Sequence, residues 1–514
     1  MEEEQPLNDY EKEHIKLLRE NSAECTLFLK QNSSFPIEKP CKVLLAGCGA
    51  RKTLKGGTGS GDVESRYFTT CEQGLESSGF EIVSKKWLDE FPKFKQEKHK
   101  EFITMIKELA EKYKSTPGHI SFGYEQPEVD YELPLDYEAD IALYVVARNS
   151  GEGADRKPIK GDFLLTDSEV RDILLLNKKF NKFMLVLNTC GVVDLSPVNE
   201  VSNILILSQL GVVTGDVLAD VILGKSNPSG KLATTWTKLS DYKFINDFGD
   251  VDETKYVEGV YVGYRYFDSV NVKPMYSFGY GKSYTEFEIN KDSVTNNKNE
   301  INVKVNVSNI GKYEGKEVVQ IYVSSPQNNK DKPYQSLVAF NKTKLLKQGE
   351  KDLLEIKFKL NDVARYDEES ASYILDNGEY IIRCGNSSNN TKVYAVVNLS
   401  EDVVVEKLKN NGGKPDFVDF KPDVKYSDDL SSVDTKINLT KNDFELIEID
   451  YNYKEKINEK ILKYSDEELA HLCVGNFPEP GQKNIQHVVG EAGESTSFIK
   501  DIDNKYFTMV DGPA

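Results

Sequence analysis

The sequence predicts a chain of several domains, with an α/β domain first and a β-sandwich second. The chain has 514 residues, and typical domains of roughly 150 residues predict about three of them. In the first half, apolar strand-like runs alternate with helix-like stretches, whereas from residue 286 onward apolar residues recur with a period of two. A hydrophobic content of 39% and a charged content of 29% are typical of chains that bury sizeable cores.

The first region, residues 1–285, carries the alternating pattern. Its strand-like runs are residues 43–46, 141–147, 183–187 and 203–207, and its helix-like stretches are 11–29, 95–113, 167–180 and 213–223. Thr166 or Asp167 is the expected N-cap of the third helix. Because the strand-like runs are continuously apolar, we expect a mostly parallel sheet that is covered on both faces. Ligands of such sheets bind at the carboxyl ends of the strands.

The second region, residues 286–400, predicts a β-sandwich of immunoglobulin-like or fibronectin type III-like form. Short alternating strands separated by turn signals support it, for example around Val303 and Val305 and at Asp376-Asn377-Gly378. We expect this region to be a packing module without chemistry of its own. Residues 401–452 are rich in charge and predict a linker, and residues 453–475 predict a helix.

Charge and cysteine content exclude several classes of partner. Asp plus Glu number 84 against 65 Lys plus Arg, which gives a net charge of −19. This charge disfavours nucleic acid and anionic lipid, and no apolar run is long enough to span a membrane. The start of the chain is acidic, unlike a secretory signal, and the seven cysteines include no CxxC pair. A reducing, cytoplasmic location without metal or organic cofactor is therefore expected, and a homo-oligomer stays open.

A glycine-rich loop, GGTGSGDV at residues 56–63, follows the first apolar run. Its glycines allow a ligand to approach the backbone closely, so a ligand-contact loop is favoured over a plain tight turn. A nucleotide-binding loop is the third reading. It is disfavoured because GxxxxGK[ST] is absent, and the nearest match, at Gly224-Lys225-Ser226, has Ala219 where the first glycine belongs.

A second loop, NSGEGADR at residues 149–156, follows the apolar run at 141–147. Glycines flank Glu152, which leaves its carboxylate on an uncluttered backbone at the carboxyl end of a strand. That position suits a general acid that later acts as a base, although the residues alone favour a solvated loop residue over a catalytic acid. Asp155 and Arg156 are expected to form ion pairs that fix the loop.

These segments together resemble glycoside hydrolase family 3, the β-glucosidase group. The resemblance rests on both loops, on KPIKGDFLLTDSE at 157–169, and on NPSGKL, EGVYVGYRYFD and YSFGYGKSYTEFE beginning at 227, 258 and 276. GEAGESTSF at 490–498 and MVDGPA at 509–514 resemble the start of the family's (β/α)₈ barrel. The resemblance implies a circularly permuted order in which the barrel comes last. Residues 453–514 hold only its opening, because a complete barrel needs roughly 250 residues.

The resemblance implies a retaining hydrolase of terminal β-glycosidic bonds that acts on a β-glucoside or an oligosaccharide. Glu152 matches the family's acid/base, Asp511 the aspartate that binds sugar hydroxyls, and Ser60 a loop hydroxyl that reaches the same sugar. The nucleophilic aspartate has no counterpart among these 514 residues, so we expect the chain alone to be inactive. From another class, a catalytically inactive carbohydrate-binding or interaction protein is the alternative.

Overall fold

The computed structural model describes most of the chain, as two compact units, Met1–Glu448 and Ile449–Ala514. The described residues are 6–58, 63, 65–121, 125–151, 155–243, 254–328, 331–422, 428, 430–451, 456–473, 475–476, 491–496 and 508–510. None of the described helices is both long enough and apolar enough to cross a membrane.

A six-stranded sheet forms the centre of the first domain, with the order β1-β6-β5-β4-β2-β3. The strands are β1 (Leu27–Lys30), β2 (Lys42–Ala46), β3 (Glu81–Ile82), β4 (Ile141–Arg148), β5 (Phe183–Thr189) and β6 (Ile204–Ile206). All neighbouring pairs are parallel except β1 with β6. Every residue of the central strands β4 and β5 is buried, which explains the continuously apolar runs at 141–147 and 183–187.

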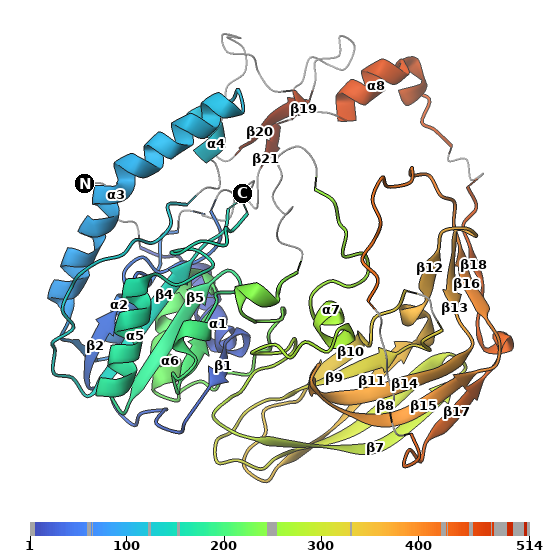
Figure 1. Ribbon diagram of the computed structural model, residues 1–514, viewed down its shortest axis with the longest axis horizontal. Helices are drawn as coiled ribbons and strands as arrows, with labels where there is room; N and C mark the ends of the chain where they lie inside the picture. Colours follow the sequence, from blue (N-terminus) through green and yellow to red (C-terminus); the bar gives the residue numbers. More distant parts are fainter. Residues whose placement is uncertain are drawn as a thin grey trace. The chain divides into compact units, whose positions relative to one another are not determined.

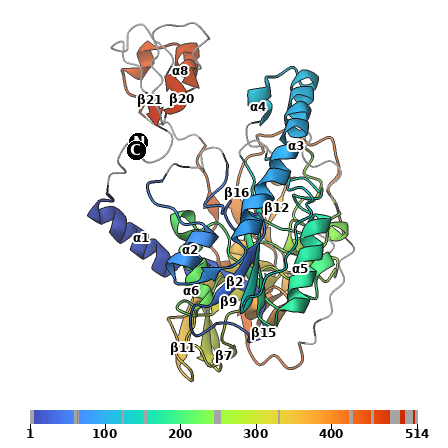
Figure 2. The ribbon, with the colours of Figure 1, turned by 90° about the vertical axis from the view of Figure 1, so that its left-hand side faces the viewer.

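Helices cover both faces of this sheet. They are α1 (Asp9–Ser22), α2 (Cys71–Ser77), α3 (Lys85–Lys112), α5 (Asp167–Lys179) and α6 (Thr214–Ile222), whereas the short α4 (Pro117–Ser121) contacts α3. Figures 1 and 2 show α5 on one face of the sheet and the α2–α6 pair on the other. Gly74 of α2 packs on Gly215, where an added Cβ would lie 2.1 Å from the backbone of α6, so neither helix tolerates a larger residue at this crossing.

The predicted strands of this domain are confirmed, but two helix predictions are wrong in extent. The helix predicted over 11–29 ends at Ser22, and Leu27–Lys30 is strand β1 instead. The apolar residues of that stretch fit both periods, and pairing with β6 decides between them. Helix α3 begins at Lys85, ten residues before the predicted start at 95, and contains Pro92 as its eighth residue. Thr166 is the N-cap of α5, as expected.

The second domain is a β-sandwich with one sheet of order β10-β9-β14-β15-β17 and another of order β11-β8-β7. Its strands are β7 (Phe287–Asn297), β8 (Glu300–Asn309), β9 (Val318–Ser324), β10 (Ser336–Lys342), β11 (Lys351–Lys359), β14 (Gly378–Ser387) and β15 (Asn390–Leu399). Antiparallel pairing sets Ile356 opposite Val303 and Leu354 opposite Val305. These alternate apolar residues are buried, as the period of two predicts.

The segment predicted as a linker, 401–452, contains strands that extend the sandwich. A four-stranded sheet joins β12 (Arg365–Asp367), β13 (Ser372–Leu375), β16 (Val403–Lys407) and β18 (Ile447–Glu448), and β17 (Lys436–Leu439) pairs in parallel with β15. Val403, Val405, Ile437 and Leu439 are buried there. Their short alternation is masked in the sequence by the charged residues around it.

The second unit has few described elements, namely α8 (Asp466–Cys473), β19 (Gly475–Asn476), β20 (Glu491–Thr496) and β21 (Thr508–Val510). The helix predicted over 453–475 is wrong in extent, because among its described residues only Asp466–Cys473 are α-helical. Ile457, Ile461 and Leu462, which lie before this helix, are exposed. Most of residues 474–514 lies outside the described residues, so the opening of a barrel there stays a prediction.

Candidate functional site

The two glycine loops singled out from the sequence lie side by side at the carboxyl edge of the six-stranded sheet. One follows β2 and the other follows β4, and these two strands are parallel neighbours. The backbone N–H of Thr58 donates to the carbonyl oxygen of Ser150 at 3.3 Å, and Thr58 forms an isolated parallel bridge with Gly151. A Cβ on Gly57 would lie 3.2 Å from the Ser150 oxygen. The small residues therefore allow the two loops to touch.

The position of this pair of loops follows from the order of the strands. From β2 the chain moves outward to β3 and then returns across β2 to β4, after which it continues to β5 and β6. The carboxyl ends of β2 and β4 therefore form the topological switch point, where open α/β sheets bind ligands. The expectation that both loops lie at carboxyl ends of strands is confirmed.

The predicted site residues themselves lie outside the described residues. This holds for Glu152 and Ser60, and for Asp511 near the end of the chain. The structure thus describes the ends of the loop that carries Glu152 but not Glu152 itself, and the three assignments stay predictions.

The segment that joins β2 to the first loop is pressed against β4. Gly47 has a φ of +93°, and an added Cβ would lie 2.3 Å from the carbonyl oxygen of Val145. The N–H of Gly49 donates to that same oxygen at 3.0 Å. A residue with a side chain at position 47 would push β2 and β4 apart, so glycine is required here to keep the switch point closed.

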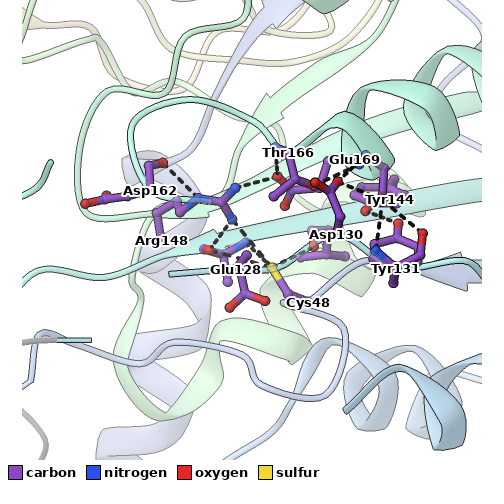
Figure 3. A network of polar contacts seen from close by, with 12 residues as sticks. Cys48, Glu128, Asp130, Tyr131, Tyr144, Arg148, Asp162, Thr166 and Glu169 are labelled. Atoms are coloured by element: carbon purple, nitrogen blue, oxygen red, sulfur yellow. Dashed lines mark hydrogen bonds and ion pairs between the residues drawn. The ribbon is translucent and has the colours of Figure 1, made fainter. Parts of the chain in front are cut away.

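Arg148, the last residue of β4, is buried at the base of the second loop. Its Nη2 lies 2.6 Å from Oε2 of Glu169, and both side chains are only 3% exposed. Its Nε donates to the carbonyl oxygen of Asp162 at 2.8 Å, and its Nη1 lies 3.7 Å from Sγ of Cys48. Figure 3 shows the guanidinium between Asp162 and Glu169. Burial opposes the charge of Arg148, but the Glu169 carboxylate outweighs it and raises the pKa of the guanidinium.

Glu169 has a second role at the start of α5. Its Oε2 also accepts from the N–H of Thr166 at 2.8 Å, and its own N–H donates to Oγ1 of Thr166 at 3.1 Å. This capping box fixes the carboxylate that holds Arg148.

Burial raises the pKa of Cys48 to about 12, so the thiol beside Arg148 stays neutral at physiological pH.

Arg156 fixes the other end of the loop. Its Nε lies 2.7 Å from Oδ1 of Asp162, its Nη2 donates to the Asp162 carbonyl oxygen at 2.8 Å, and its Nη1 donates to the Val192 carbonyl oxygen at 2.6 Å. The predicted ion pair of Arg156 is therefore confirmed. Asp155, the other residue expected to form one, is exposed.

Two hollows flank Glu128 at this edge. A small cavity of about 80 Å³ lies against the loop ends, and its lining includes Arg148, Ser150 and Asp155. A wider one of about 550 Å³ lies against the first half of α3, and its lining includes Phe91 and Lys95. Glu128 lines both, and its Oε1 lies 2.5 Å from Nζ of Lys95. The edge thus offers charged and apolar walls of the kind that a polar ligand with an apolar part could occupy.

Sequence reasoning missed Arg148, Asp162 and Glu169. One signal was present, since Arg148 is a charged residue at the end of an otherwise apolar buried strand, and such a charge needs a buried partner. Nothing in the spacing identifies that partner as Glu169. Among the described residues, no group of three or more His, Cys, Asp or Glu side chains is arranged to hold a metal ion.

Comparison with known families accounts for this architecture. Residues 26–284 match the glycosyl hydrolase family 3 C-terminal domain, and residues 317–388 match the fibronectin type III-like domain. The chain belongs to glycosyl hydrolase family 3. The two family 3 modules occupy the six-stranded α/β domain and the β-sandwich, in that order.

Relatives and solved structures agree with this assignment. The chain is 33% identical to β-glucosidase A of Butyrivibrio fibrisolvens over 77% of this chain and 52% of that protein. It resembles the structure of β-glucosidase 3B from Thermotoga neapolitana in complex with α-D-glucose, with a TM-score of 0.64 and 33% identity over 76% of this chain and 55% of that one. A β-glucosidase from Paenibacillus barengoltzii gives a TM-score of 0.66 at 27% identity, over 79% of this chain and 45% of that one. The chain spans about half the length of these curated relatives and of others that it matches.

Proposed function

We propose that this chain contributes the acid/base half of a retaining β-glucosidase. The observation that carries the proposal is the contact between the two loops at the switch point, in a chain whose modules are those of family 3. A loop at the carboxyl end of a buried parallel strand gives a carboxylate a rigid base and access to substrate. Relatives named β-glucosidases support a β-glucoside or an oligosaccharide as substrate.

In the proposed mechanism, Glu152 acts twice. As an acid it protonates the glycosidic oxygen while a carboxylate attacks the anomeric carbon, and as a base it then takes a proton from the water that releases the sugar. We propose that the attacking carboxylate lies outside these 514 residues, in the barrel that the resemblance implies. Ser60 and Asp511 would bind hydroxyls of the non-reducing sugar. The cytoplasmic location expected from the sequence stays a prediction.

Hydrolysis of cellobiose tests this proposal. The protein from the whole reading frame should release glucose, and Glu152→Gln should lower kcat/KM by about 10²–10⁴-fold, because the amide cannot protonate the leaving oxygen. The exposed Glu200→Gln is the matched control and should retain the wild-type rate. The 514-residue chain alone should release no glucose.

Two results would overturn the proposal. An unchanged rate in Glu152→Gln would remove the role of Glu152. Binding of cellobiose without hydrolysis by the wild-type protein would favour the catalytically inactive carbohydrate-binding alternative.

A further inference from the structure

We propose that Asp162 is a positioning residue for Glu152, because it ties together both ends of the loop that carries this glutamate. The inference rests on the proposed function. Arg148 directly precedes residues 149–155 and Arg156 directly follows them. Both arginines converge on Asp162, so a segment of seven residues is closed at its base by one residue.

The first tie runs from β4 to the backbone of Asp162. Nε of Arg148 donates to the Asp162 carbonyl oxygen at 2.8 Å, while Glu169 holds the far side of the same guanidinium at 2.6 Å. Because the Arg148–Glu169 pair is almost completely buried, the guanidinium has no freedom to follow the loop. This end of the loop is therefore fixed to the sheet.

The second tie runs from the far end of the loop to the carboxylate of Asp162. Oδ1 accepts from Nε of Arg156 at 2.7 Å, and Oδ2 accepts from the backbone N–H of Lys157 at 2.5 Å. A charge-assisted pair and a backbone bond on one carboxylate restrict both the side chain of Arg156 and the main chain beside it. Both carboxylate oxygens of Asp162 thus accept hydrogen bonds from residues at the C-terminal end of the loop.

The turn that carries Asp162 is itself anchored. Gly161 has a φ of +81°, and an added Cβ would lie 1.9 Å from the carbonyl oxygen of Glu128. Glu128 N–H donates to the Gly161 carbonyl oxygen at 2.9 Å, and Gly161 N–H donates to the Leu164 carbonyl oxygen at 2.8 Å. Asp162 therefore holds the loop from a rigid position, so a change in its side chain acts on the loop.

This geometry has a consequence for acid catalysis. Proton donation requires a hydrogen-bond distance between the acid and the leaving oxygen, and small displacements of a catalytic group cost large factors in rate. In Asp162→Asn one acceptor oxygen becomes an NH₂ group that cannot accept, so the side chain loses the bond from Nε of Arg156 or the bond from the N–H of Lys157. The variant should loosen the loop while leaving the apolar core of the domain intact.

The test compares two substrates that differ in their need for an acid. Cleavage of cellobiose needs protonation of its leaving oxygen, whereas the 2,4-dinitrophenolate of a 2,4-dinitrophenyl β-glucoside leaves unprotonated. In the protein from the whole reading frame, Asp162→Asn should lower kcat/KM for cellobiose by about 10–100-fold, a part of the full value of acid catalysis. It should change kcat/KM for the dinitrophenyl substrate by less than about 3-fold, because binding and attack by the nucleophile do not use the acid.

Asp220→Asn is the matched control. The carboxylate of Asp220 accepts two hydrogen bonds from Arg19, one from Nε at 2.6 Å and one from Nη2 at 2.8 Å. Asp220 lies on α6 and not at the switch point. Its substitution should lower the melting temperature without changing the ratio of the two rates. Arg156→Lys keeps the charge but loses the several N–H donors of the planar guanidinium. It should therefore shift the ratio of the cellobiose and dinitrophenyl rates in the same direction as Asp162→Asn.

The outcomes separate this inference from the proposed function. Equal losses on both substrates in Asp162→Asn, or a shifted ratio in Asp220→Asn, would overturn the positioning role while the effect of Glu152→Gln still stands. A wild-type protein that hydrolyses neither substrate would overturn both. Circular dichroism shows whether each variant folds. If Asp162→Asn does not fold, the ratio of the two rates in Arg156→Lys decides instead.

Discussion

The α/β domain and the β-sandwich each contain buried ion pairs, but these pairs lie at different kinds of position. In the α/β domain, the buried pair Arg148–Glu169 lies at the carboxyl edge of the sheet, beneath the loop proposed to act on substrate. In the sandwich, Lys332 and Arg365 pair with Asp376, whose side chain is 1% exposed, at the end of β13 and away from both glycine loops. A buried ion pair therefore does not by itself indicate a functional site. The residues that adjoin the pair in the chain, such as the glycine loop after Arg148, are the better indicator.

The largest expected effect in this comparison comes from the sandwich. Asp376→Ala removes the carboxylate that Lys332 and Arg365 share, while Arg365 keeps its second pair with Asp367 at 2.9 Å. Removing one partner of a buried ion pair typically costs about 3–5 kcal/mol in the free energy of unfolding. Chemical denaturation of the sandwich measures this cost. In the folded variant the ratio of the cellobiose and dinitrophenyl rates should equal that of the wild type. A shifted ratio would erase the distinction between the two buried pairs.

A smaller effect is expected where the two domains meet. Asp268, in α7 (Tyr264–Ser269), accepts from Nε2 of Gln335 at 2.9 Å. Burial raises the pKa of this carboxyl to about 6, with the Gln335 bond acting in the opposite direction. The folded protein thus keeps a proton that the unfolded chain has already lost, so stability should fall as the pH rises from about 4 to about 6.

Asp268→Asn removes this titration. At pH 7 the variant should be more stable than the wild type by about 1–2 kcal/mol, because a partly buried carboxylate no longer has to ionise. Below pH 4 the two proteins should have nearly equal stability. Thermal melts across this pH range measure the difference, and parallel curves for both proteins would show that Asp268 titrates normally.

The fold was predictable where one pattern dominated a stretch of sequence. Continuous apolar runs predicted β4 and β5, and alternation predicted β8 and β11. Strand β1 was missed because Leu27–Leu29 continues an apolar helical period, and only pairing with β6 makes it a strand. The short strands β16 and β17 were missed because charged neighbours hide their alternation.

The site was predictable in its loops but not in its supports. The glycines of both loops, and Glu152 between two of them, are local features of the sequence. Both loops could therefore be found without the structure. Arg148, Asp162 and Glu169 are brought together by the path of the chain through β4, a turn and α5, and no spacing rule identifies that contact. Polar residues that act through tertiary contact need the structure.

The most direct test of the central claim, that Glu152 is the acid/base of a retaining β-glucosidase, is a trapping experiment with azide. Glu152→Ala should still be glycosylated by 2,4-dinitrophenyl β-glucoside, since that leaving group needs no acid, and should then stall for lack of a base. Azide attacks the anomeric carbon without a base and displaces the enzyme carboxylate. Proton NMR should therefore show β-glucosyl azide from Glu152→Ala and none from the Glu200→Gln control. Glucose as the product of Glu152→Ala at the wild-type rate, without the azide adduct, would contradict the account.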